Sequence, residues 1–169
     1  MLNHFTHRQR GFTLLEVVSV LVLIGIISAV AISRVMSTTQ ITLKANAETL
    51  KVHLRYAQLR ALNNTEKAWG VYFIGGGVYK LYYADTTGTH DVPSPGGDGN
   101  TVTLQNVDAI TTNDGGSQVS FDKWGKPYMS LRANFDASPD PQTVNRAITL
   151  TSGGSTETIT ITKNTGYIP

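Results

Sequence analysis

Residues 12–32 read FTLLEVVSVLVLIGIISAVAI, and this stretch decides how the rest of the chain is organised. It carries one charged residue, Glu16. As a helix rising about 1.5 Å per residue, it reaches roughly 30 Å, the thickness of the hydrocarbon layer of a bilayer. A buried strand or a helix in a soluble core is shorter than this. We therefore expect a membrane-spanning helix over residues 12–33.

The residues before this helix predict its orientation. The segment MLNHFTHRQRG, residues 1–11, holds Arg8 and Arg10 and no acidic residue. Basic residues next to a membrane span keep that end in the cytoplasm. Everything after residue 33 then faces the periplasm or the cell exterior, and the chain is a single-pass protein of the inner membrane.

A secretory signal peptide and a plain signal anchor are the alternatives for this helix. The apolar region of a signal peptide runs about 7–15 residues and ends at a small-residue cleavage site. The run here is longer, and SAVAIS at its far end matches such a site only loosely. Neither alternative explains Glu16, because a carboxylate near the bilayer edge costs a few kcal/mol. We interpret Glu16 as a functional residue whose partner lies elsewhere.

The segment RGFTLLE, residues 10–16, followed by an apolar run, resembles the signal of type IV pilins and type II secretion pseudopilins. That family has a short basic leader, a glycine, an aromatic residue and a glutamate four residues after it. The resemblance implies that a prepilin peptidase cuts between Gly11 and Phe12 and methylates the new amine of Phe12. The leader, residues 1–11, would then be lost.

The resemblance also implies a role for Glu16. In a filament the helices pack into a bundle without water, and the Glu16 carboxylate would pair with the Phe12 ammonium group of an adjacent subunit. The chain would be a non-enzymatic structural subunit, a minor pilin or pseudopilin, of a type IV pilus or a type II secretion pseudopilus. Its partners would be other pilin or pseudopilin subunits, prepilin peptidase, the lipid of the inner membrane and an assembly platform.

The helical pattern continues past the membrane segment, to about Asn63. Apolar residues recur on one helix face at spacings of three and four. They are Leu43, Ala47, Leu50, Leu54, Ala57 and Ala61. We expect residues 34–64 to be an amphipathic helix, weakest over the polar residues 37–42. Coiled-coil pairing is the alternative for this stripe, and docking on a sheet is favoured because the stripe is short and rich in alanine.

After Glu66 the hydrophobic period changes to two, which predicts strands. Residues 67–74 and 78–84 flank three glycines, a hairpin signal. Further short strands are expected at residues 102–104, 119–121, 128–131, 147–151 and 158–162, and surface loops at residues 85–100, 111–117 and 136–143. The predicted fold is α+β and pilin-like. A long N-terminal helix, transmembrane in its first half, packs by its C-terminal half on an antiparallel β-sheet domain of residues 65–169.

This layout resembles one branch of the family, the minor pseudopilin H and FimT/FimU-type minor pilins. The segments that carry the resemblance are LKVHLRYAQLRALNN, FDKWGKPY and the C-terminal AITLTSGGSTETITITKNTGYIP. The chain departs from many type IV pilins in having Ser33 where they have proline. The helix kink that such a proline causes is therefore in question here.

Composition excludes several classes of site. The chain has no cysteine, so it has no disulfide and no thiolate metal site. His4 and His7 lie in the leader, and we interpret His53 and His90 as solvated rather than as metal ligands. The aspartates of residues 85–114 match no calcium-loop spacing, so we interpret them as solvated turn residues. We expect no cofactor and no metal.

The remaining alternatives concern what the β domain binds. Some FimT-like minor pilins bind DNA through a basic C-terminal tail, but residues 65–169 hold 7 basic and 10 acidic residues here. Phosphate contacts need clustered Lys and Arg, which disfavours DNA as a partner. A single-span membrane protein with a ligand-binding periplasmic β domain is the other alternative. No nucleophile elbow or carboxylate pair is present, so the sequence predicts no enzyme.

Overall fold

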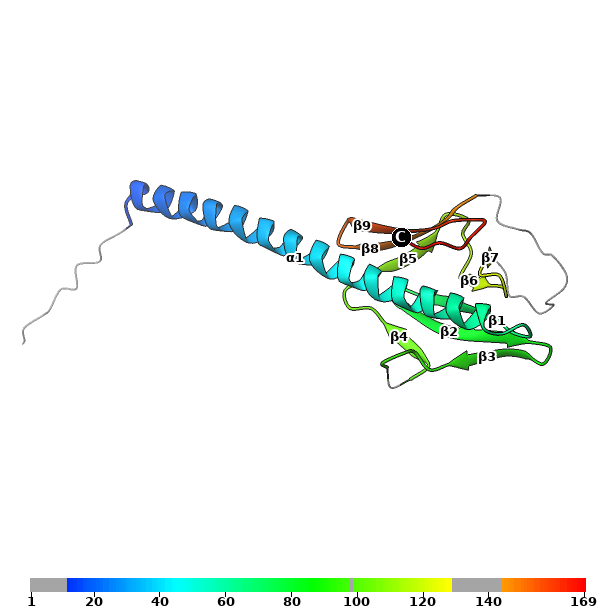
Figure 1. The fold of residues 1–169 in the computed structure, drawn as a ribbon. Coiled ribbons are helices and arrows are strands. Elements are labelled where there is room, and N and C mark those ends of the chain that lie inside the picture. Colours follow the sequence, from blue (N-terminus) through cyan, green and yellow to red (C-terminus); the bar gives the residue numbers. More distant parts are fainter. Residues whose placement is uncertain (1–11, 98, 129–143) are drawn as a thin grey trace, which may run out of the picture. The chain divides into compact units, whose positions relative to one another are not determined.

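The computed structural model describes residues 12–97, 99–128 and 144–169, except for the side chains of residues 33–37. The leader, and with it Gly11, lies outside the described residues. The chain divides into two compact units, which we call the N-terminal unit, Met1–Thr38, and the C-terminal unit, Thr39–Pro169. One helix, α1, Leu14–Leu62, belongs to both of them (Figure 1). The predicted long helix is therefore confirmed, and residues 37–42, expected to be its weakest part, are helical.

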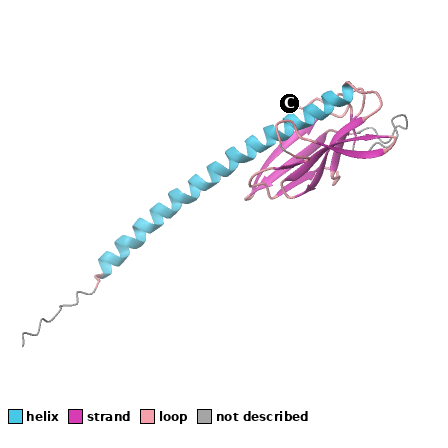
Figure 2. Ribbon diagram, turned by 90° about the horizontal axis from the view of Figure 1, so that it is seen from below, coloured by secondary structure: helices cyan, strands magenta, loops and turns pink. Residues whose placement is uncertain are grey.

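In the C-terminal unit, α1 buries the apolar face that its sequence predicts. All six residues of the stripe from Leu43 to Ala61 are at most 2% exposed. Burying one leucine fully contributes about 2 kcal/mol, so this face holds the helix against the strands (Figure 2). Docking on a sheet, and not coiled-coil pairing, accounts for the stripe within the chain.

The larger sheet has six antiparallel strands. The order along it is β3-β2-β1-β6-β7, and β4 pairs with the first residues of β2. The strands are β1 Ala68–Gly75, β2 Val78–Asp85, β3 Gly88–Val92, β4 Thr101–Thr103, β6 Gln118–Phe121 and β7 Pro127–Tyr128. The predicted hairpin at Gly75–Gly77 is confirmed, and both Gly75 and Gly76 adopt a positive φ there.

A second sheet has three antiparallel strands in the order β5-β8-β9. They are β5 Ala109–Thr112, β8 Arg146–Ser152 and β9 Ser155–Ile161. Along β8, buried and half-buried residues alternate strictly, as the alternation of Thr with apolar residues predicts. Both sheets and α1 contribute to one core, in which Ile148, Leu150, Ile159 and Ile161 of the second sheet lie with Val71 and Leu81 of the first.

Three expectations about the strands are wrong. Residues 85–100 are not all loop, because β3 lies within them, and β5 reaches into the expected loop at residues 111–117. The strands also form two sheets and not one. Strand β3 reads GTHDV and buries none of its residues fully, so it has no apolar alternation to detect. The loop at residues 136–143 and most of the strand at residues 128–131 lie outside the described residues.

Candidate functional site

The N-terminal unit exposes a continuous apolar surface. Every side chain from Phe12 to Ile32 is exposed within the chain. The helical residues Leu14–Ile32 have a mean hydropathy of 2.7 and are long and apolar enough to cross a membrane. Since burying apolar surface yields about 25 cal/mol per Å², lipid or other helices are the environments that stabilise this segment. It is a surface for anchoring or assembly.

Thr13 caps the start of α1 and places Glu16 in its first turn. The Thr13 hydroxyl oxygen accepts a hydrogen bond from the Glu16 amide at 3.3 Å, and the Thr13 carbonyl oxygen accepts one from the same amide at 3.1 Å. A threonine followed three residues later by a glutamate is the capping-box pattern. A carboxylate in the first turn also interacts favourably with the helix dipole. The local sequence thus explains both the helix start and the place of Glu16.

The Glu16 side chain is exposed, and among the described residues no cation pairs with it. Phe12 and Glu16 border one shallow depression on the helix surface, together with Val17, Val20 and Leu21. A cation near residue 12 would therefore meet the carboxylate at an apolar surface. An unpaired charge in such surroundings is costly, so a cation at this place would offset the cost of burying the Glu16 carboxylate.

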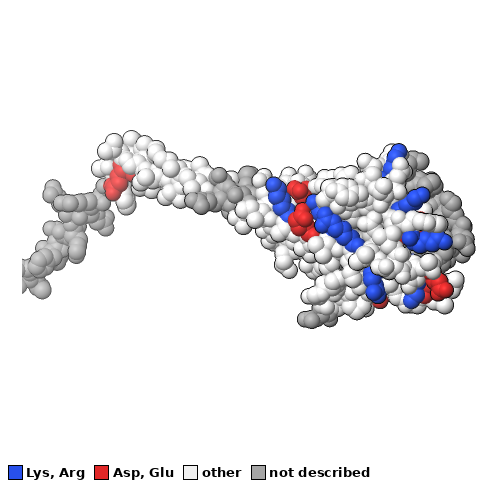
Figure 3. Space-filling view, in the orientation of Figure 1, with Lys and Arg blue, Asp and Glu red and all other residues white. Residues whose placement is uncertain are grey.

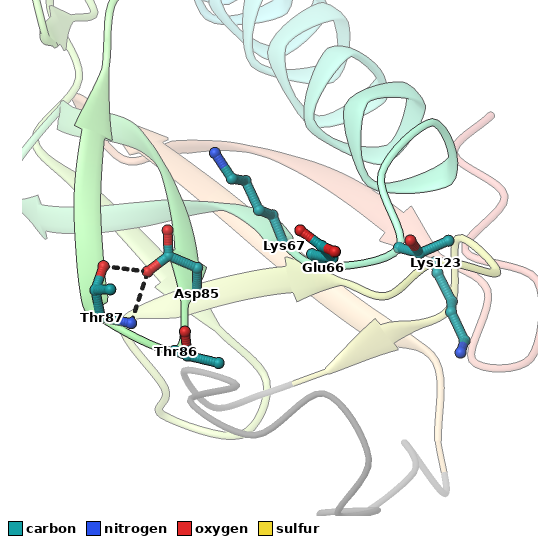
Figure 4. Close-up of a pocket in the computed structure, with 7 residues that line it drawn as sticks. Glu66, Lys67, Asp85, Thr86, Thr87 and Lys123 are labelled. Atoms are coloured by element: carbon teal, nitrogen blue, oxygen red, sulfur yellow. Dashed lines mark hydrogen bonds between the residues drawn. The ribbon is translucent and has the colours of Figure 1, made fainter.

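A cleft of about 600 Å³ opens in the C-terminal unit between the segment after α1, the β2–β3 turn and the turn after β6 (Figure 4). Its lining is polar and consists of Thr65, Glu66, Lys67, Asp85, Thr86, Thr87 and Lys123. The Asp85 carboxylate accepts hydrogen bonds from the Thr87 hydroxyl at 2.5 Å and from the Thr87 amide at 2.8 Å. These bonds lower the pKa of Asp85, so its carboxyl group is ionised, and it already accepts hydrogen bonds from Thr87.

The cations of the cleft contact aromatic rings. Lys67 Nζ lies 4.1 Å from the ring centroid of Tyr83, and Lys123 Nζ lies 4.5 Å from that of Trp124. In Figure 4 the two lysine side chains point away from each other. An acid–base mechanism needs groups within hydrogen-bond reach of one reacting atom. The described lining residues of this cleft show no such arrangement.

The interpretation of His53 as a solvated residue is wrong, whereas the His90 side chain is 42% exposed. His53 is 6% exposed, and its Nδ1 lies 2.6 Å from the hydroxyl oxygen of Tyr79. His53 follows Leu50 by three residues, so helical spacing places it beside the buried stripe, and that spacing could have revealed its burial. His90 lies on β3 and not in a loop, and its ring stacks on Tyr83 with centroids 4.7 Å apart.

The described aspartates of the set considered for calcium have partners within the chain, and Asp98 lies outside the described residues. Asp91 pairs with Lys80 at 2.8 Å, and Asp108 accepts a hydrogen bond from the Gly153 amide at 2.8 Å. Asp114 forms an ion pair with the buried Arg146, so its interpretation as a solvated residue is wrong. Over residues 12–97, 99–128 and 144–169, no group of three or more His, Asp or Glu could hold a metal ion.

Sequence reasoning missed the role of Gln58. Its Nε2 atom lies 2.9 Å from the carbonyl oxygen of Gly125, 3.2 Å from that of Thr165 and 3.0 Å from that of Gly166. One amide thus ties the end of α1 to the turn after β6 and to the C-terminal tail. Nothing in the sequence points to it, because all three acceptors are backbone groups distant in the chain.

Comparison with known protein families identifies the N-terminal segment. The prokaryotic N-terminal methylation motif matches residues 6–32. The match includes Gly11, Phe12 and Glu16, and it confirms the resemblance to the type IV pilin signal. No curated protein sequence matches the chain.

The fold is similar to that of the type IV minor pilin FimU of Pseudomonas aeruginosa strain PAO1. Its crystal structures in two crystal forms match with TM-scores of 0.50 and 0.52, at 13% sequence identity. The matches cover 75% and 78% of this chain and 90% of the FimU chain. At this identity the similarity shows the fold alone, and it confirms the predicted pilin-like α+β architecture.

Proposed function

We propose that this chain is a structural subunit, a minor pilin or pseudopilin, of a filament built from type IV pilin-like proteins. One coincidence carries the proposal. The methylation motif at residues 6–32 overlaps an exposed apolar helix, and the same chain has a FimU-like fold. A pure anchor needs the apolar helix, but it has no need of the motif. The filament is a type IV pilus or a type II secretion pseudopilus.

The proposed mechanism assigns a role to each N-terminal residue. Prepilin peptidase cleaves after Gly11, removes the leader, residues 1–11, and methylates the amine of Phe12. Residues 12–33 hold the subunit in the inner membrane, with residues 34–64 continuing the helix into a periplasmic β domain of residues 65–169. During assembly the helix leaves the lipid for a bundle of similar helices.

Glu16 supplies the attraction that accompanies this transfer. Removing a lone carboxylate from water is costly, and a nearby ammonium group offsets that cost. The methylated Phe12 amine of a neighbouring subunit is such a group. The absence of a cationic partner for Glu16 among the described residues of its own chain supports this assignment.

The mature N-terminus tests the proposal. Mass spectrometry of the protein from its native membranes is expected to show a chain that begins with N-methylated Phe12. Replacing Gly11 by a bulky residue, for instance Gly11→Leu, should leave the chain starting at Met1 and keep it out of filaments. Native protein that begins at Met1 would instead identify a membrane-anchored domain with a chance motif match.

A further inference from the structure

Four large apolar side chains are exposed at one end of the C-terminal unit, where α1 stops. They are Leu59 and Leu62 of α1, Trp124 of the turn after β6, and Tyr167 of the C-terminal tail, and we call them the α1-end patch. Between 48% and 64% of each residue is exposed. Single exposed apolar residues are ordinary, but a group of them with two aromatic residues is typical of a binding surface.

Backbone contacts bring the members of the α1-end patch together. A Cβ atom placed on Gly125, next to Trp124, would lie 3.3 Å from the Leu62 side chain. Gly166, next to Tyr167, abuts the Gly125 carbonyl group so closely that it has no room for a Cβ atom. Both glycines have a positive φ, which other residues rarely adopt. The turn that carries Trp124 and the tail that carries Tyr167 therefore pack against each other and against the end of α1.

Gln58 holds these three segments in place. Its amide donates to carbonyl groups of the turn and of the tail, and Arg55 also donates to the Ile168 carbonyl oxygen at 3.1 Å. The Asp122 carboxylate accepts hydrogen bonds from the amides of Trp124 and Lys126, which fixes the turn that presents Trp124. A surface that is ordered before binding loses less entropy when a partner docks.

Basic residues flank the α1-end patch, and the acids Glu66 and Asp85 lie in the polar cleft that Lys123 also lines. Lys123 precedes Trp124 in the chain, and its ammonium group lies over the Trp124 ring. Lys126 follows Trp124 by two residues. Arg55 lies at the tail. The acid of the turn, Asp122, is buried and is used inside the turn. Figure 3 shows Lys and Arg side chains spread over the visible face of the C-terminal unit, with Asp and Glu side chains beside some of them. A partner for this patch therefore has acidic residues around an apolar centre.

We infer that the α1-end patch docks on an acidic, apolar surface of a different subunit of the same filament. The inference rests on the proposed function. Two copies of the patch facing each other would place cations against cations. A nucleic acid would leave Leu59 and Leu62 without a role, because phosphate contacts use Lys and Arg. A fluid lipid surface adapts to any shape and gains nothing from the fixed geometry that Gln58 imposes.

Photo-crosslinking in filament-forming cells tests this inference with the full-length chain. The variant Trp124→p-benzoylphenylalanine places the probe in the patch, and Ile74→p-benzoylphenylalanine is the control at another exposed residue, 54% exposed, in β1. We expect an adduct with another filament subunit from position 124 and none from position 74. The linked peptide of that subunit should contain Asp or Glu.

Charge reversal completes the test. The double variant Lys123→Glu with Lys126→Glu should reduce the yield of the adduct about tenfold, since a disrupted hot spot costs at least one order of magnitude in affinity. The matched reversal Lys44→Glu, at an exposed residue of α1, should leave the yield unchanged. Tyr167→Ala should also lower the yield of the adduct, and it leaves the sequence of the turn after β6 unchanged.

The outcomes separate this inference from the proposed function. A chain that enters filaments but forms no adduct from position 124 overturns the docking inference and leaves the function standing. The same holds for an adduct with a second copy, lipid or nucleic acid, or for a yield that Lys123→Glu with Lys126→Glu does not change. A chain that starts at Met1 and never enters a filament overturns the proposed function itself.

Discussion

Gly70, in the middle of β1, has no room for a larger side chain, because atoms of the two neighbouring strands lie close to it. It lies opposite Tyr82 of β2 and Ser120 of β6. A Cβ atom at this residue would lie 2.3 Å from the Val119 carbonyl oxygen and 2.8 Å from the Tyr82 hydroxyl oxygen. The first of these neighbours is backbone and cannot rotate away. The Tyr82 side chain, which is almost fully buried, lies across the space that the missing Cβ leaves.

The variant Gly70→Ala is therefore expected to lower the free energy of unfolding by about 3 kcal/mol, as overpacking of a sheet interior does. Chemical denaturation of the full-length protein in detergent measures this change. The control is Gly99→Ala, because a Cβ atom at Gly99 meets nothing within 4 Å. That variant should stay within about 0.5 kcal/mol of the unmodified chain. Equal stability of the two variants would contradict the steric argument.

His53 joins α1 to β2 as a neutral group. Burial lowers the pKa of His53 below its ordinary value of 6.5, and a hydrogen bond to the Pro95 carbonyl group opposes this only in part. Burial also raises the pKa of its partner Tyr79, which keeps the hydroxyl group protonated. The pair is thus stable as an uncharged hydrogen bond, and protonation of the imidazole would place a charge in the core.

The pH dependence of stability follows from this difference. Between the lowered pKa of His53 in the folded chain and 6.5 in the unfolded chain, the unfolded state binds more protons. The free energy of unfolding therefore falls as the pH is lowered through 6.5 and is at its full value above it. We expect His53→Gln to flatten this slope in denaturation series near pH 7.5 and pH 5.5. His90 is present in both proteins, so an unchanged slope would exclude His53 as its cause.

At the scale of elements, the end of α1 is held by contacts with backbone groups rather than by apolar packing alone. Gln58 and Arg55 donate to four carbonyl groups of the turn after β6 and the C-terminal tail. The tail also buries Ile168, which is 3% exposed. Since each exposed carbonyl group could instead bond to water, the value of this arrangement lies in positioning the segments.

We expect Gln58→Ala to release the turn and the tail from α1. The loss of the hydrogen bonds that the two N–H groups of this amide donate at a half-buried site should cost about 2 kcal/mol. Hydrogen–deuterium exchange should show faster exchange over residues 163–169 and little change in β8. Gln40→Ala, at an exposed residue of the same helix, is the matched control. Slow exchange of the tail in Gln58→Ala would show that Ile168 suffices to hold it.

At the scale of the whole molecule, the two units differ in whether the chain itself buries their apolar side chains. The C-terminal unit buries its apolar residues in one core that α1 and both sheets share. The N-terminal unit exposes all of its described apolar residues. Substitutions near Glu16 should therefore change the localisation and the assembly of the chain, while the core of the C-terminal unit stays folded.

The variant Glu16→Leu tests this separation. Removing the charge makes the segment more apolar, so retention in the membrane should not decrease. On the proposed function, incorporation into filaments is expected to fall about tenfold or more, because the Phe12 amine of the neighbouring subunit would lose its partner and remain charged in an apolar bundle. The ratio of the subunit in sheared filaments to that in membranes measures this effect. Normal incorporation of Glu16→Leu would favour a plain membrane anchor.

The sequence alone determined the features that depend on neighbours in the chain. Each of these features is defined by residues a few positions apart. They are the apolar run, the motif around Gly11, the buried stripe of α1 and the β1–β2 hairpin. Helical and strand periods are local properties, so their side-chain patterns can be read without knowing the fold. The N-terminal motif is a local pattern too, and it pointed to the pilin resemblance before any fold was known.

The tertiary structure alone decided which distant groups meet. Strand β3 has no apolar alternation of its own, and its pairing with β2 makes it a strand. The pairing of Arg146 with Asp114 and the three acceptors of Gln58 join segments that lie far apart in the chain. The sequence positions of polar side chains and backbone carbonyl groups follow no period from which their hydrogen-bond partners could be predicted. Their contacts follow from how the helix and the two sheets pack, because burial leaves each polar group only the partners that the fold brings near.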